Sequence, residues 1–74
     1  MELRKSQILL AIYERLRKGE KLRPLDIESE FGISRPTFHR YIAEIRAFLA
    51  NENISMDLLF VKAENYYCLR DYSI

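Results

Sequence analysis

The sequence feature that most constrains the fold is the stretch from Ile27 to Ile42 in the middle of the chain. Gly32 and, two residues later, Ser34 separate two segments whose apolar residues recur at helical spacing. Glycine readily takes the positive φ that ends a helix, and serine accepts a hydrogen bond from the free amide groups that begin one. The stretch therefore predicts a short helix over residues 24–31, a tight turn, and a longer helix over residues 35–50, which together form a helix-turn-helix.

The longer of these two helices has a clear apolar stripe and a clear polar face. Phe38, Ile42, Ile45 and Leu49 follow one another at steps of four, three and four residues, which predicts one buried side. Pro36 is tolerated because the first helical turn needs no amide donor at that position. The side opposite the stripe carries four polar residues. They are Arg35, Thr37, His39 and Arg40.

The rest of the chain predicts a first helix and a terminal hairpin. Apolar residues at helical spacing indicate a helix over residues 4–18, which Gly19 ends, and residues 20–23 form a connector or one short strand. Two strands, 57–62 and 66–71, flank a turn in which Asn65 takes a left-handed conformation, so the hairpin spans residues 57–71. The expected fold class is α+β, with three helices and a C-terminal two-stranded hairpin in a single domain over residues 1–74.

Composition excludes several kinds of protein. One cysteine and one histidine cannot form an internal disulfide or a zinc site, so no metal or cofactor is expected. The apolar runs are too short to span a bilayer, and the N-terminus lacks the architecture of a cleavable signal, so the expected location is the cytoplasm without membrane association. A chain of 74 residues without such cross-links must use nearly every apolar residue in its core or against a partner.

The formal net charge of +1 hides a segregation along the chain. Residues 1–23 have seven basic and three acidic side chains, and residues 32–50 have three basic and one acidic. The segment 24–31 has three acidic side chains and no basic one, and residues 51–74 have four acidic and two basic. Positive charge is thus expected on the first helix with its following loop and on the third helix, as a modest footprint for nucleic acid.

Three segments in this order resemble a known family. Gln7-Ile8-Leu9 lies in the first helix, Asp26 to Ile42 matches a helix-turn-helix pattern, and Tyr67-Cys68-Leu69 ends the hairpin. Together they are similar to the winged helix-turn-helix at the N-terminus of DeoR-type and WYL-domain bacterial transcription regulators. The resemblance covers nearly the whole chain and implies a three-helix domain with a hairpin wing, whose third helix reads DNA.

The resemblance also implies roles for single residues. Ser34, Thr37 and Arg40 match positions that contact phosphate or bases, and Arg35 and His39 match variable positions that face the groove. The chain departs from the family pattern at three places. Glu28 stands where a small residue packs between the helices, Tyr41 replaces an aspartate, and Asn65-Tyr66 stands where the wing often has glycines.

The predicted DNA-binding residues are therefore those of the third helix and its neighbours. Six residues at the start of the third helix would enter the major groove: Ser34, Arg35, Pro36, Thr37, His39 and Arg40. The alternative is that they form a solvated helix face. Arg35 is the candidate for a bidentate guanine contact. His39 is either a pH switch or plain polar surface. Lys21 and Arg23 before the second helix serve either phosphate contact or solubility, and Lys62 near the wing tip is an open candidate beside Glu64.

Both faces of the first hairpin strand are apolar. Leu59 and Val61 point to one side of the strand, and Leu58 and Phe60 point to the other. A wing covers the core with one side only, so we expect a surface for a homodimer or a further effector domain. It would consist of Leu58, Phe60, Tyr66, Tyr72 and Ile74. The alternative is a strand that starts later and buries half of these side chains. Cys68 is expected to be a small packed hydrophobe rather than a redox sensor.

The function expected from the sequence is binding to specific double-stranded DNA by a bacterial or phage-type transcription regulator. A dimer would read two half-sites one helical turn apart. The alternative is a winged-helix module for protein–protein interaction that has weakened or lost DNA binding, in line with its near-neutral charge and its acidic second helix. An enzymatic activity is not expected, because no positioned base, nucleophile or metal set accompanies His39.

Overall fold

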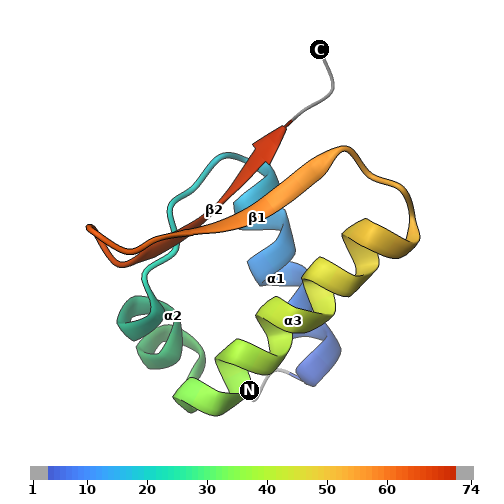
Figure 1. Cartoon of the computed structure of the whole chain (residues 1–74). Helices are drawn as coiled ribbons and strands as arrows, with labels where there is room; N and C mark the ends of the chain where they lie inside the picture. The colour runs from blue at the N-terminus through green and yellow to red at the C-terminus, as the bar shows by residue number, and fades with distance from the viewer. Residues whose placement is uncertain (1–3, 72–74) are drawn as a thin grey trace.

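Three helices precede an antiparallel hairpin in a computed structural model that describes residues 4–71 (Figure 1). The helices are α1 (Lys5–Arg17), α2 (Pro24–Phe31) and α3 (Arg35–Asn51), and the strands are β1 (Met56–Val61) and β2 (Tyr66–Asp71). Each observed boundary lies within one residue of the predicted one. The α+β class with three helices and a C-terminal hairpin is thereby confirmed, in an arrangement consistent with a winged-helix layout.

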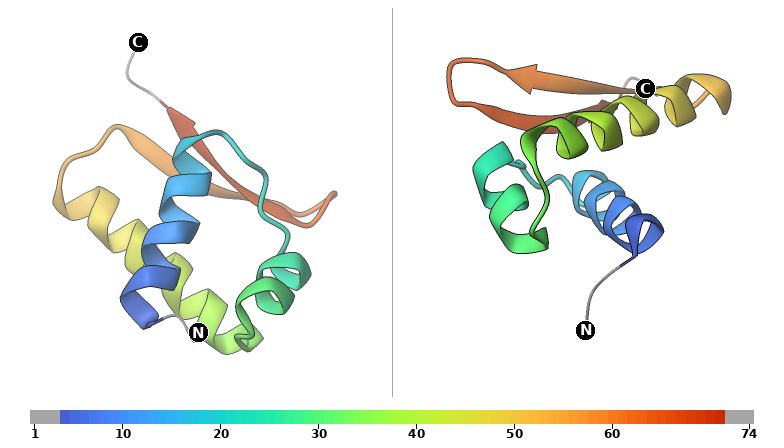
Figure 2. Two further views of the ribbon diagram at one scale, coloured as in Figure 1. Left: turned by 180° about the vertical axis from the view of Figure 1, so that it is seen from behind. Right: turned by 90° about the horizontal axis from the view of Figure 1, so that it is seen from below.

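The hairpin pairs Met56 with Asp71 at its open end and Val61 with Tyr66 beside the turn. Leu22 joins β2 as an isolated antiparallel bridge, because its amide and carbonyl exchange hydrogen bonds of 2.9 and 2.8 Å with Tyr67. Of the two alternatives that the sequence left open, the connector between α1 and α2 is therefore not a strand but a loop with a single-residue bridge to β2. Seen from below, the hairpin runs along one side of the molecule and α1 and α2 along the other (Figure 2).

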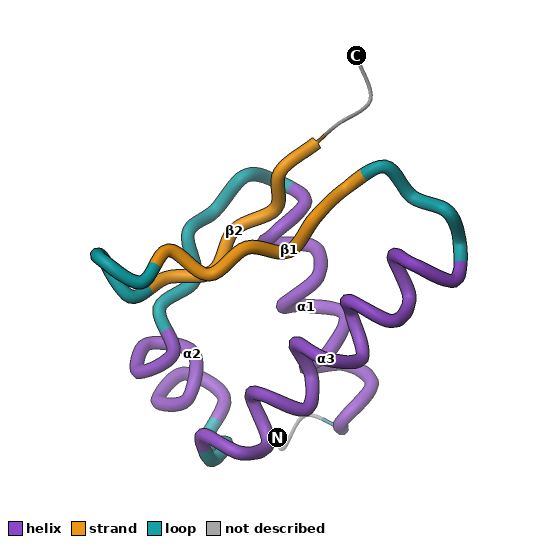
Figure 3. Tube along the Cα trace, in the orientation of Figure 1, coloured by secondary structure: helices purple, strands orange, loops and turns teal. Residues whose placement is uncertain are grey.

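Left-handed residues mark the turns of the chain. Gly19 and Gly32 follow α1 and α2 with φ values of 87° and 63°, as their positions in the sequence predict. Asn65 has φ 56° in the hairpin turn, and Asn53 has φ 53° after α3. The loop from α2 to α3 is short and the one from α3 to β1 is longer (Figure 3). The tight α2–α3 link fixes how these helices cross.

The core lies where the three helices and the inner side of the hairpin meet. Phe38 and Ile12 are fully buried, and the ring of Phe38 packs edge-on against Tyr67 with centroids 5.5 Å apart. Arg46 joins α3 to β1, because its guanidinium donates hydrogen bonds of 3.1 and 3.4 Å to the carbonyl oxygen of Leu58. Within residues 4–71, twelve buried hydrophobic residues form the core: Ile8, Ile12, Leu16, Leu22, Ile27, Phe38, Tyr41, Ile42, Ile45, Leu49, Leu58 and Tyr67.

The hairpin faces the core with the side that the sequence assigned to a partner. Leu58 is buried at 3% exposure, so its predicted place on a partner surface is wrong. Phe60 lies on the same side of β1, with its ring 4.8 Å from that of Tyr67, and is 41% exposed because the core ends there. Tyr66 pairs with Val61 and therefore lies on the outer side of the hairpin. The predicted surface is thus split between two sides of the wing. Tyr72 and Ile74 lie outside the described residues.

Within residues 4–71, none of the helices combines the length and the apolar character that crossing a membrane requires.

Candidate functional site

The turn before α3 positions the candidate site. The hydroxyl oxygen of Ser34 accepts a hydrogen bond of 3.3 Å from the amide of Thr37, which confirms Ser34 as the N-cap. Pro36 lies in the first turn, where it removes no helical hydrogen bond. Gly32 caps α2, and the amide of Ile33 donates to the carbonyl of Glu28 at 3.1 Å. Both sides of the turn are therefore fixed, and the first residues of α3 stand at a defined angle to α2.

The first turns of α3 separate buried from exposed side chains as the sequence predicts. Phe38, Tyr41 and Ile42 lie in the core, whereas Arg35 and His39 are exposed. Arg40 and Pro36 are exposed as well, and Thr37 is half-buried. The predicted contact residues on α3 thus lie together at the end of the helix nearest α2.

Ser34, Thr37 and Arg40 are linked along one edge of α3. The hydroxyl of Ser34 donates to that of Thr37 at 3.0 Å, and a terminal nitrogen of Arg40 reaches the same Thr37 oxygen at 3.4 Å. The link brings two hydroxyl groups and one guanidinium together beside the N-terminus of the helix. Hydroxyls, guanidinium groups and helix N-termini are all groups that bind phosphate oxygens.

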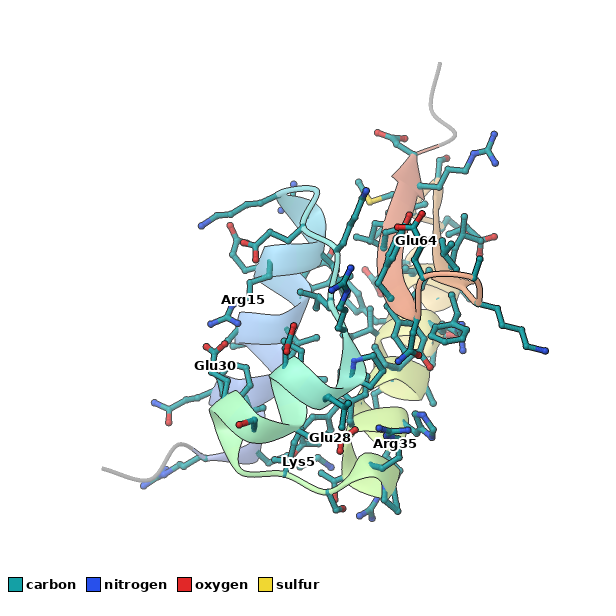
Figure 4. All side chains as sticks on the ribbon, turned by 90° about the vertical axis from the view of Figure 1, so that its left-hand side faces the viewer. Lys5, Arg15, Glu28, Glu30, Arg35 and Glu64 are labelled. Carbon is teal, nitrogen blue, oxygen red and sulfur yellow. The ribbon has the colours of Figure 1, made fainter. Side chains whose placement is uncertain are left out.

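Arg35 has an acidic partner that the sequence did not predict. Its Nε donates a hydrogen bond of 2.5 Å to Glu28 on α2 (Figure 4). The side chain of Glu28 is 17% exposed, whereas that of Arg35 is 48% exposed. Glu28 therefore packs its stem between α2 and α3, where the family pattern has a small residue, and uses its carboxylate to hold Arg35. Nε is the guanidinium nitrogen that Glu28 holds.

The three basic residues predicted outside α3 differ in their surroundings. Arg23 is exposed at the N-cap position of α2. The ammonium of Lys21 lies 5.1 Å from the ring centre of Tyr66, so it covers the outer side of the wing. Lys62 is exposed in the turn of the hairpin, two residues from Glu64. Arg23 and Lys62 are thus open to solvent, whereas the ammonium group of Lys21 lies against Tyr66 of the wing.

Two further ion pairs use basic residues of α1. Arg15 forms a bidentate pair with Glu30 of α2, with one hydrogen bond of 2.7 Å, and its guanidinium also lies over Phe31 (Figure 4). Lys5 pairs with Glu44 of α3 at 3.6 Å. The positive charge on α1 is therefore partly neutralised by the neighbouring helices, which the charge count along the sequence could not show.

The Arg15–Glu30 pair predicts a pH dependence of stability. Hydrogen bonds from Arg15 lower the pKa of Glu30 below its ordinary value of 4.5, and partial desolvation opposes the change. Because the folded state has the lower pKa, the pair stabilises the fold above about pH 4.5, and this contribution is lost as the pH falls through the lowered value. Exposed pairs contribute about 0.2–1 kcal/mol, and screening of the half-exposed Glu30 places it at the lower end.

Thermal unfolding of Glu30→Gln followed by circular dichroism between pH 2 and pH 7 measures this effect. The variant should melt a few degrees below the wild type at pH 7, and the difference should vanish at low pH. Glu64→Gln, in the exposed hairpin turn, is the control and should follow the wild type. A difference between Glu30→Gln and the wild type that stays constant over the whole range would contradict the assignment.

Cysteine chemistry and metal binding give no second site within residues 4–71. Cys68 is half-buried on the outer side of the hairpin opposite Leu59 and is not in a disulfide. In the part of the chain that the structure describes, no three histidine, cysteine or acidic side chains gather closely enough to hold a metal ion.

Searches with this chain against protein-family models, curated proteins and solved structures matched none of them.

Proposed function

We propose that this domain binds specific double-stranded DNA by inserting the first turns of α3 into the major groove. The observation that carries the proposal is the exposed basic end of α3, with Arg35, His39 and Arg40 on a helix whose other side is buried in the core. A helix with its side chains is about 10–12 Å wide, which fits a major groove of about 12 Å. The rigid turn at Gly32 and Ser34 would hold this helix at a fixed angle to DNA.

The neighbouring groups fit contacts to phosphate. Ser34, Thr37 and Arg40 lie beside the N-terminus of α3, where the helix dipole favours an anion. Arg23 before α2 and Lys62 at the wing tip extend the positive surface beyond α3. These groups would set the orientation of the domain on the duplex, while Arg35 and His39 would read base edges.

Three of these residues also match the pattern that resembles DeoR-type and WYL-domain regulators: Ser34, Thr37 and Arg40. We therefore infer a cytoplasmic transcription regulator of bacterial or phage type as the protein in which this domain acts. Its activity would be binding, without catalysis and without a cofactor. The departure at Glu28 acquires a role under this proposal, because its carboxylate holds Arg35 beside the groove-facing end of α3.

Salt-dependent binding tests the proposal directly. We expect fluorescence anisotropy with duplex DNA to show log K falling linearly with log salt, at about −0.9 per phosphate neutralised. If four basic residues each neutralise one phosphate, the slope would be about −3.6. These residues are Lys21, Arg23, Arg40 and Lys62. Arg40→Ala should reduce its magnitude by about 0.9, whereas Arg70→Ala, at the end of β2 far from the hairpin turn, should leave it unchanged.

A second candidate is a winged-helix module that binds protein instead of DNA. The observation that favours it is the neutralisation of Lys5, Arg15 and Arg35 by Glu44, Glu30 and Glu28. Absence of salt-dependent binding to duplex DNA at low ionic strength would support this module and would contradict the DNA-binding proposal.

A further inference from the structure

An apolar groove runs between α1 and α3, away from the candidate site. The side chain of Leu10 stands 65% exposed on its α1 side, and that of Phe48 is 47% exposed on its α3 side. The rings of Phe48 and Tyr13 meet edge-on across the groove, with centroids 5.7 Å apart. The groove is lined by Leu9, Leu10, Tyr13, Glu44, Ile45 and Phe48. Two of the largest exposed apolar side chains in the described residues thus lie at one place.

The groove lies on a flank of α3, not on the face proposed for DNA. Phe48 follows Arg40 by eight residues, which at 3.6 residues per turn places it about 80° around the helix. A partner seated in the groove would therefore leave the exposed end of α3 open.

The charges around the groove select among partners. Lys5 and Glu44 form an ion pair of 3.6 Å at its edge, and Glu14 and Arg17 follow Leu10 and Tyr13 by one helical turn on α1. The edge thus carries two positive and two negative side chains. A strongly acidic or basic partner gains nothing from such an edge. A two-fold interface places a surface against itself, so balanced charge avoids the like-charge contact that an edge of one sign would create.

The shape of the surface has the same property. Leu10 projects beside the hollow between Tyr13 and Phe48, so one surface offers both an apolar projection and an apolar recess. Self-complementarity of this kind is what a two-fold dimer requires. We infer that the groove binds a second copy of this chain, with Leu10 and Phe48 of each protomer packed into the groove of the other.

The size of the surface sets the strength of the dimer. A stable interface buries about 800 Å² on each partner. Six lining residues and the few charged side chains at their edge provide less buried area than that. The dimer is therefore weak in free solution, with a dissociation constant on the order of tens of micromolar or more. It forms without DNA, so the inference does not require the DNA-binding proposal.

Sedimentation equilibrium from about 10 µM to about 1 mM, chosen to bracket that constant, tests the inference with a matched pair of variants. Leu10→Glu and Leu25→Glu change leucines of nearly equal exposure, 65% and 64%, but Leu25 lies on α2 outside the groove. We expect the wild type and Leu25→Glu to reach a dimer at high concentration and Leu10→Glu to associate at least about tenfold more weakly. Circular dichroism spectra should show all three chains folded.

A second readout needs no variant. Backbone NMR spectra recorded on dilution should change at Leu9, Tyr13 and Phe48 and stay constant at His39 and Arg40. A wild type that remains monomeric up to about 1 mM would overturn the inference, and so would equal weakening by Leu10→Glu and Leu25→Glu. Binding of Leu10→Glu to a duplex with one half-site should equal that of the wild type, so a failure of DNA binding is recognised separately.

Discussion

Phe38→Ala should leave the domain only marginally stable at 25 °C. The ring of Phe38 is fully buried and packs against Tyr67, so it joins α3 to the hairpin as well as filling the centre of the core. Removing a buried phenylalanine ring costs about 3–5 kcal/mol, because the lost contacts add to the cost of the cavity. Whole domains have a free energy of unfolding of about 5–15 kcal/mol, and one this small lies near the lower end.

Urea denaturation followed by circular dichroism measures this loss. With a slope near 1 kcal/mol per molar urea for a small domain, the midpoint should fall by several molar or the transition should disappear. Phe48→Ala is the matched control, since it makes the same chemical change at a ring that is 47% exposed. Measured at a few micromolar, below the range expected for self-association, it should cost about 1 kcal/mol or less. Equal losses in the two variants would contradict the assigned core.

The helical part of the fold was predictable because apolar residues at helical spacing form a stripe along α1 and α3. Ile8, Ile12 and Leu16 recur at intervals of four residues, and all three are buried in α1. Ser34 and Gly32 are local signals, and each has the capping role that its side chain or backbone freedom predicts. Local chemistry alone thus specified the order of elements and the exposed end of α3.

The side of the hairpin that meets the core was not predictable in the same way. A strand shows its buried side by alternating apolar with polar residues, and Leu58-Leu59-Phe60-Val61 has no polar residue. Only the packing of β1 and β2 against α3 decides that Leu58 faces inward. Without that contrast the predicted partner surface took residues from both sides of the wing: Leu58 lies in the core, whereas Tyr66 lies on the outer side.

The ion pairs between helices could not be predicted from the sequence either. Glu28 and Arg35 are seven residues apart, and the glycine turn between them decides whether they meet. Arg15 and Glu30 meet only because α1 and α2 lie side by side. The groove had one signal in the sequence: Leu10 is apolar but lies off the stripe of Ile8, Ile12 and Leu16. A single exposed apolar residue is ordinary on a protein surface, so only the place of Leu10 beside Phe48 in the groove makes it part of an apolar patch.

Arg35→Ala should weaken binding to the preferred duplex by about 1–3 kcal/mol, or roughly 5–150-fold, if Arg35 reads a guanine. The preferred duplex would first be selected from a random pool, and affinities would then be measured for each substitution at every base pair. Preference should relax at one base pair only, with the salt slope unchanged. Equal weakening on all sequences, together with a smaller slope, would instead identify a phosphate contact.

Arg35→Lys separates charge from geometry at the same position. Lysine keeps the positive charge but lacks the planar fork, so it should recover little affinity at a bidentate guanine contact and most of it at a phosphate. Glu28→Gln tests the pair from the other side. Loss of an acidic group should raise binding to unrelated DNA, while loss of the hold on Nε should reduce discrimination at the base pair that Arg35 reads.

The double variant decides whether Glu28 acts through Arg35. If it does, discrimination in Glu28→Gln/Arg35→Ala should equal that in Arg35→Ala alone, because nothing remains to be positioned. Additive losses would show that Glu28 influences base preference by another route. The cycle also separates the two candidate functions, since a protein-interaction module would show no base preference for either residue to change. Equal discrimination in the double variant and in Arg35→Ala would identify Glu28 as the residue that positions a half-exposed arginine to read one base pair.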